Sequence, residues 1–212
     1  ALAAVAFAFC PFIYSHFAHI QLLMSFGVPL VLWRLHRFVE SAGWSDALAL
    51  GAAMALTGLS CGYYGIFSGL AAAFGVVWFG MVLGRWRAPA YWVRAGAAGF
   101  LAVAIVLPFF LPYLDIRAAG FERTLDDARL NSADWRAYLA SPVALHAWML
   151  PLIGSWKEVL FPGFMTIGLA AFAVGPFGGP RRMPGVRLPR GVTGFYVALA
   201  VLSAWASFGP DA

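Results

Sequence analysis

The stretch AGAAGFLAVAIVLPFFLPYL, residues 95–114, contains no charged side chain. A helix needs about 20 consecutive apolar residues to cross the hydrocarbon core of a bilayer, and this stretch has that length. Arg94 and Asp115 bound it, as expected of a span that ends at both membrane surfaces. Proline is disfavoured inside helices, so Pro108 and Pro112 predict a kink in this span or its end.

The rest of the chain shares this apolar character. Of its 212 residues, 62% are hydrophobic and only 11% are charged, and the mean hydropathy is +0.81. Soluble domains have about 25% charged residues, so this chain could not cover a compact fold with polar surface. The composition predicts an all-α polytopic membrane protein, a transmembrane helix bundle of about six or seven spans.

Seven apolar segments are predicted to cross the membrane as one transmembrane domain over residues 1–212. Their approximate ranges are 1–13, 17–33, 46–61, 65–84, 94–114, 159–178 and 191–208. The connections are short except for residues 115–158. Loops of this length are usually functional or disordered, and the aromatic content of this one predicts one or two short helices on the membrane. The first segment is short and starts at Ala1, so we interpret the sequence as an internal piece of a longer membrane protein.

Basic residues are distributed unequally between the two predicted sides. Three connections on one side hold nine of the fourteen Lys and Arg residues: Arg34, Arg37, Arg85, Arg87, Arg94, Arg181, Arg182, Arg187 and Arg190. Cytoplasmic loops carry an excess of basic residues, so this side is predicted to be cytoplasmic and the 115–158 loop extracytoplasmic. The positive charge is then a topology signal, and the expected partners are membrane lipids and no nucleic acid.

Two histidines lie at the predicted outer surface, in YSHFAHIQLL at residues 14–23. His16 and His19 are three residues apart and would share one face of a helix. They could supply two metal ligands, but only a tertiary contact with His146 would complete a set. Alternatively the imidazoles mark the membrane interface, or contact a phosphate or a sugar hydroxyl at the lip of an outward cavity. No metal site is predicted, and a divalent cation stays open as a cofactor.

Tyrosines and a carboxylate add candidates on the same predicted side. Tyr63 and Tyr64 follow a turn in SCGYYG. They are either interfacial aromatic residues or rings that stack on a sugar or an isoprenoid chain. Glu158 lies at the mouth of a span, where a carboxylate is costly unless it is solvated or paired.

The segment SADWRAYL, residues 132–139, combines an acid, a base and aromatic rings. Asp134 lies beside Trp135 and Arg136, and Tyr138 follows one helical turn later. This combination is typical of a carbohydrate site, but Asp134 or Ser132 could equally be an ordinary helix cap.

The familiar soluble-enzyme motifs GxGxxG, P-loop and HExxH do not occur in the sequence. Ionisable residues are nearly missing from the interiors of the predicted spans. This argues against an ion-coupled transporter with a midplane carboxylate, and places any chemistry at the outer surface.

Several stretches together resemble bacterial membrane proteins of the GT-C glycosyltransferase superfamily, in its dolichyl-phosphate-mannose-transferase-like branch. They are SHFAHIQLLMSFGVPLVLWRLHRFVE (15–40), GLSCGYYGIFSGL (58–70), SADWRAYLASPVALHAW (132–148), EVLFPGF (158–164) and SFGP (207–210). These motifs are short and degenerate, and they are spread along most of the chain, from residue 15 to residue 210.

The resemblance implies an enzyme of the bacterial inner membrane. Such an enzyme transfers a sugar from a polyprenyl-phosphate donor to a glycan, lipid or protein acceptor on the extracytoplasmic side. The catalytic acid of the family typically lies in the first outer loop, upstream of this piece, so no catalytic residue is assigned. The substrate-binding candidates are His16, His19, Tyr63, Tyr64, Asp134, Arg136, Tyr138, His146 and Glu158. A transporter or flippase, and a non-catalytic membrane protein of envelope polysaccharide assembly, are the alternatives.

Overall fold

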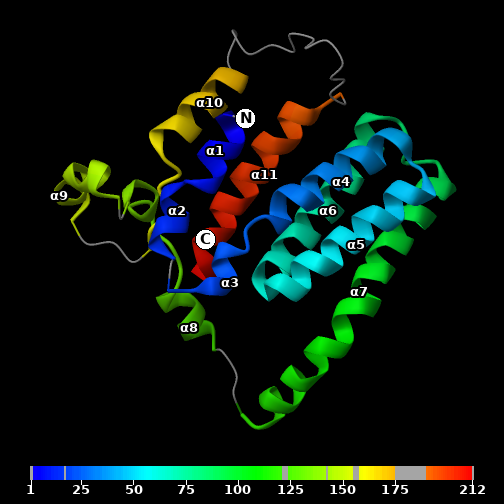
Figure 1. Ribbon diagram of the computed structural model, residues 1–212, viewed down its shortest axis with the longest axis horizontal. Coiled ribbons are helices and arrows are strands. Elements are labelled where there is room, and N and C mark those ends of the chain that lie inside the picture. Colours follow the sequence, from blue (N-terminus) through cyan, green and yellow to red (C-terminus); the bar gives the residue numbers. More distant parts are fainter. Residues whose placement is uncertain are drawn as a thin grey trace. The chain divides into compact units, whose positions relative to one another are not determined.

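The computed structural model describes residues 2–16, 18–120, 124–141, 143–154, 158–174 and 190–211. All regular elements in these ranges are helical (Figure 1). The prediction of an all-α chain is therefore confirmed for the described part of the chain.

The chain divides into two compact units. The bundle unit comprises Met24–Glu122 and Leu188–Phe195, and the loop unit comprises Ala1–Leu23, Arg123–Arg187 and Tyr196–Ala212. The bundle unit is built from α4 (Gly27–Ser41), α5 (Trp44–Ser60), α6 (Gly62–Val82) and α7 (Pro89–Ala118). The loop unit contains α1 (Leu2–Ala8), α2 (Pro11–Ser15), α3 (Ile20–Leu23), α8 (Leu125–Leu130), η1 (Ala137–Leu139), η2 (Ala144–Met149), α9 (Leu150–Ile153), α10 (Phe164–Val174) and η3 (Gly209–Asp211). Helix α11 (Val192–Ser207) starts in the bundle unit and continues into the loop unit.

Three helical segments are long and apolar enough to cross a membrane: Ile20–Ser41, Gly62–Val82 and Pro89–Ile116. They match the predicted spans 17–33, 65–84 and 94–114. The other predicted spans correspond to shorter helices within the described residues. At a rise of about 1.5 Å per residue, the 17 residues of α5 reach about 26 Å, just short of a typical hydrocarbon core. Residues 175–178 of the predicted span 159–178 lie outside the described residues.

The first of these segments differs from its predicted range at both ends. A break separates α3 from α4, and α4 continues past Trp33 to Ser41. The helix continues because Val31, Leu35 and Phe38 are all fully buried at helical spacing. It ends at Ala42, which adopts a left-handed conformation with φ 47° and donates its N–H to the Phe38 carbonyl.

The sequence predicts that Pro108 and Pro112 either kink the span or end it, and helix α7 excludes the second outcome. It continues through Pro108 and Pro112 to Ala118, so neither proline ends the helix. The predicted loop 115–158 therefore begins inside α7. Its later part is folded: α8, η1, η2 and α9 are short helices within it, in keeping with the expectation that this loop folds.

Helix α5 is the centre of the bundle unit and packs against α4, α6 and α7. Its small residues make these close contacts possible, as in other membrane helix pairs. A Cβ at Gly51 would lie 2.6 Å from the carbonyl oxygen of Ala98 in α7, and a Cβ at Gly65 in α6 would lie 2.5 Å from the Cα of Gly58. At these positions only glycine lets the backbones approach.

Aromatic side chains fill the rest of the bundle interior. Phe38 stacks on Tyr91 with ring centroids 5.3 Å apart, and the Tyr91 hydroxyl donates to the Val76 carbonyl at 2.7 Å. This hydrogen bond ties α7 to α6. Phe195, from the first turn of α11, contacts Phe79 at 5.1 Å and is fully buried.

Candidate functional site

Seven of the nine candidate residues fall in the loop unit, and Tyr63 and Tyr64 fall in the bundle unit. The loop unit joins the N-terminal helices to the distant segment that follows Arg123. One direct contact is at Gly163, where a Cβ would lie 3.3 Å from the ring of Pro11. Helices α1 and α10 also pack against each other. The fold thus brings His16 and His19 into the same compact unit as the long loop.

The expectation that His16 and His19 share a helix face is wrong. Helix α2 ends at Ser15, and His19 precedes α3, because the chain turns between them with the His19 N–H bonded to the His16 carbonyl at 2.9 Å. The rings still lie side by side, with centroids 6.1 Å apart. His16 Nδ1 lies 2.6 Å from the Ser15 hydroxyl oxygen and 2.8 Å from the Phe12 carbonyl oxygen, so His16 has local polar partners.

Asp134 precedes η1, whose N-cap residue is Arg136 and not Asp134 or Ser132, the two predicted caps. The Asp134 carboxylate accepts a hydrogen bond from the Ala137 N–H at 3.0 Å, at the start of η1. The Arg136 guanidinium lies over the Trp135 ring, 5.6 Å from its centroid. The Asp134 and Arg136 side chains are half-buried at the surface of the loop unit, and the Trp135 side chain is exposed.

Tyr138 connects the long loop to the end of α11. Its hydroxyl lies 2.8 Å from the hydroxyl of Ser207, and its ring contacts Phe208 at 6.2 Å. The Ala133 N–H donates to the Ser207 carbonyl nearby. These contacts explain why the SADWRAYL and SFGP motifs, far apart in sequence, lie together in the loop unit.

His146 lies in the interior of the loop unit. Its Nδ1 is 2.9 Å from the Ser141 hydroxyl oxygen, and the rings of Phe161 and Phe164 pack edge-on against it at 5.0 and 5.4 Å. Only 8% of the residue is exposed. Glu158 is half-buried, two residues before Leu160, whose N–H donates to the Ala137 carbonyl.

Cations of the long loop are only partly described. Arg123 and Lys157 lie outside the described residues, as does the side chain of Arg117. Arg129 pairs with Asp126 at 2.9 Å on the surface of α8. Within the described ranges, His, Cys, Asp and Glu side chains do not form a group of three or more that could hold a metal ion.

Tyr63 and Tyr64 lie in the first turn of α6, directly after the connection at Cys61. The single extended residue Cys61 separates α5 from α6, with φ −155° and ψ 115°. This agrees with the predicted tight turn. The Tyr63 side chain is 53% exposed, so its ring is free to contact a molecule at this end of the bundle unit.

The opposite end of the bundle unit gathers arginines from separate connections. Arg85 donates to the Glu40 carbonyl at 2.8 Å, and Arg94 donates to the Ala42 carbonyl at 2.5 Å. Arg37 lies 3.8 Å from Asp46. The α4–α5 and α6–α7 connections therefore lie at one end, which the charge pattern predicted.

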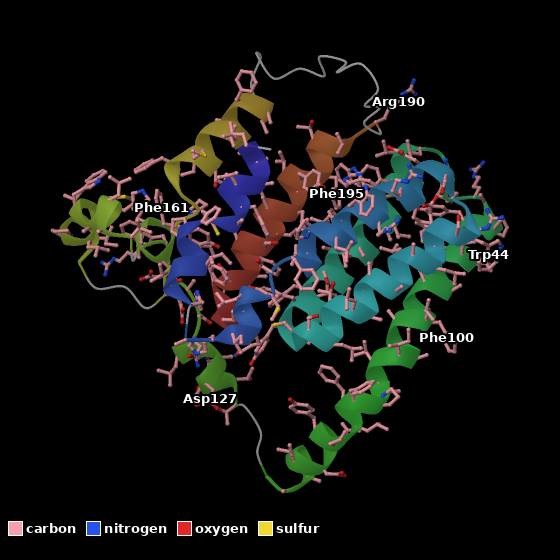
Figure 2. The ribbon with its side chains drawn as sticks, viewed as in Figure 1. Trp44, Phe100, Asp127, Phe161, Arg190 and Phe195 are labelled. Carbon is pink, nitrogen blue, oxygen red and sulfur yellow. The ribbon has the colours of Figure 1, made fainter. Side chains whose placement is uncertain are left out.

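Tryptophans surround these arginines. The Arg34 guanidinium lies 4.1 Å from the Trp33 ring centroid, and that of Arg87 lies 4.6 Å from the Trp86 ring centroid. We call this the arginine end, and it comprises Arg34, Arg37, Arg85, Arg87, Arg94 and Arg190, all in the bundle unit. Figure 2 labels Arg190, which belongs to the arginine end, and Trp44, which lies near it at the start of α5.

Comparisons of this chain with protein-family models, with curated proteins and with solved structures found no match. Its own residues and geometry are therefore the basis for its proposed function.

Proposed function

We propose that this chain is part of a polytopic integral membrane glycosyltransferase of the GT-C type with six or seven spans. In this proposal the enzyme transfers a sugar from a polyprenyl-phosphate donor to a glycan, lipid or protein acceptor outside the bacterial inner membrane. The observation that carries the proposal is the loop unit, in which His16 and His19 join the folded segment that holds Asp134, Arg136 and Tyr138.

The proposed reaction is attack of an acceptor hydroxyl on the anomeric carbon, with the polyprenyl phosphate as leaving group. The hydroxyl needs a general base, which we place upstream of Ala1. The departing phosphate needs hydrogen-bond donors or positive charge. Arg129, Arg136 and the imidazoles of His16 and His19 are the candidates for this role among the described side chains of the loop unit, and Arg129 is paired with Asp126.

The charge pattern supports the proposed orientation. The arginine end would face the cytoplasm, and Tyr63 and Tyr64 lie in the turn at the other end of α5 and α6. Residues 115–158 would then be extracytoplasmic. Aromatic residues at both ends suit the two interfaces of a bilayer.

The interior of the bundle unit favours an enzyme over a transporter. The buried hydroxyls of Thr57 and Ser68 donate to carbonyls of their own helices, Ala53 and Tyr64. The buried Tyr91 hydroxyl donates to the Val76 carbonyl of α6. Polar groups satisfied in this way do not line a pathway for a polar substrate, whereas transporters place substrate sites near the midplane.

Replacing His19 by alanine in the full-length protein tests the site. We expect His19→Ala to lower kcat/KM for release of polyprenyl phosphate from hexose- or pentose-linked donors by at least about tenfold, since one lost donor to developing charge has such an effect or a larger one. His36→Ala, in α4 of the bundle unit, serves as the control and should change it by less than about twofold. Equal effects of the two substitutions, at equal thermal stability, would remove His19 from the site.

A further inference from the structure

A groove on the bundle unit follows from how its helices pack. Helices α6 and α7 both pack on α5, but they contact each other little beyond the region where Tyr91 bonds to Val76. The space between them is a groove of about 310 Å³, with Leu50 and Met54 of α5 at its floor. Its walls are Gly69, Ala72 and Val76 of α6 and Trp92, Gly96 and Gly99 of α7, together with neighbouring small residues. All of these side chains are apolar along the groove.

Such a groove on a membrane-spanning bundle needs a hydrocarbon occupant. Water is not stable in an apolar cavity because it finds no polar partners there, and an unfilled groove forfeits the dispersion contacts of its walls. The glycines of α7 leave room for an occupant: a Cβ at Gly96 or Gly99 would meet no atom within 4 Å.

One end of the groove lies at the arginine end. Trp92 lines the groove, and its indole N–H donates to the Trp86 carbonyl at 2.8 Å. The Trp86 ring in turn carries the guanidinium of Arg87. Trp92 and Trp86 therefore link the apolar walls of the groove to the exposed guanidinium of Arg87.

The positive charge at this end of the groove favours an occupant with an anionic headgroup. Among the described residues, the arginine end holds six arginines and two carboxylates, Glu40 and Asp46, and Asp46 is paired with Arg37. The side chain of Arg87 is exposed. Basic residues beside a membrane attract anionic lipid headgroups, by about 1 kcal/mol each.

We propose that this groove binds one acyl chain of an anionic glycerophospholipid, whose phosphate contacts Arg87. The proposed phosphate contact at Arg87 lies at the arginine end, whereas Tyr63 and Tyr64 lie in the first turn of α6 at the other end. The lipid site is separate from the proposed sugar-transfer site, and it does not depend on that proposal. The lipid would fill the gap between α6 and α7, and so stabilise the bundle unit.

Native mass spectrometry of the purified chain with added lipid tests the site. Phosphatidylglycerol should bind at least about fivefold more tightly than phosphatidylcholine, since one arginine contributes about 1 kcal/mol. Gly96→Leu fills the groove and should weaken phosphatidylglycerol binding about tenfold, the effect of losing roughly two buried methylene contacts. Gly168→Leu in α10, where a Cβ also meets nothing within 4 Å, is the matched control and should leave binding unchanged.

A pair of arginine substitutions separates a local contact from a general charge effect. Arg87→Gln should weaken phosphatidylglycerol binding about fivefold and leave phosphatidylcholine binding unchanged. Arg34→Gln removes the same charge from α4, which does not line the groove, and should have less than a twofold effect. Thermal unfolding of each variant shows that it is folded, and Gly99→Leu is a second groove variant should Gly96→Leu not fold. Equal binding of the two lipids, or tight binding to a folded groove variant, would overturn the proposal.

Discussion

Replacing Phe195 by alanine should lower the free energy of unfolding by about 3 kcal/mol, the usual cost of emptying a buried phenylalanine site. Phe195 is fully buried and contacts three rings of the bundle unit: Phe74 at 5.7 Å, Phe79 at 5.1 Å and His36 at 6.3 Å. Its loss removes these contacts together. For a chain of this length the expected decrease in Tm is roughly 6–12 °C, measured by tryptophan fluorescence of the purified protein in detergent.

Phe100→Ala is the matched control for this change. Phe100 lies on α7 with 75% of its surface exposed, and Figure 2 shows it pointing away from the bundle. Its truncation removes few protein contacts, so we expect less than about 0.5 kcal/mol. Equal losses of stability for the two variants would contradict the packing of Phe195 described above.

Replacing Gly51 by leucine should also be strongly destabilising, by about 3 kcal/mol, because overpacking against backbone cannot be relieved by a rotamer change. A Cβ at this position would lie 2.6 Å from the Ala98 carbonyl oxygen. The leucine side chain would push α5 away from α7. The α5–α7 interface is the most extensive helix–helix interface of the bundle unit. The expected decrease in Tm is about 6–12 °C.

Gly99→Leu is the matched control: it makes the same substitution at a position of α7 where the added side chain has room. A Cβ there meets nothing within 4 Å, and leucine favours helix more than glycine by up to about 1 kcal/mol. The Tm of this variant should stay unchanged or increase. A Tm of Gly51→Leu close to that of Gly99→Leu would mean that α5 and α7 are not in close contact.

The helical class of the fold was predictable because a bilayer leaves few options for an uncharged run such as residues 95–114. Helix ends were less predictable. The charge of Arg34 predicts the end of a span at residue 33, whereas α4 continues to Ser41, and Arg34 and Arg37 are not among its buried residues. The buried spacing of Val31, Leu35 and Phe38 was the signal that could have shown this.

The contacts of α5 were missed for a different reason. Its small residues, Ala47, Gly51, Ala55 and Gly58, recur at three- or four-residue spacing, which is typical of close membrane helix packing. The sequence contains this pattern, but which helix it contacts depends on tertiary packing. The partner backbone at Ala98 could not be read from either segment alone.

The candidate site was predictable in composition but not in geometry. His16 and His19 lie in the same unit as most of the long loop, whereas Tyr63 and Tyr64, predicted on the same side, lie in the bundle unit. The local partners could not be predicted, since they depend on where α2 ends and on the approach of α11. The Ser15 contact of His16 and the Ser207 contact of Tyr138 are examples.

Labelling of single cysteines in intact cells tests the proposed membrane orientation most directly. In a chain with Cys10 and Cys61 replaced by serine, Leu130→Cys places a thiol on α8, where the native side chain is 69% exposed. Ala88→Cys places one in the exposed α6–α7 connection at the arginine end. We expect a membrane-impermeant maleimide to label Leu130→Cys in intact cells, and Ala88→Cys only after the membrane is opened. Labelling of both positions from outside, or of Ala88→Cys alone, would contradict the orientation and with it the extracytoplasmic site.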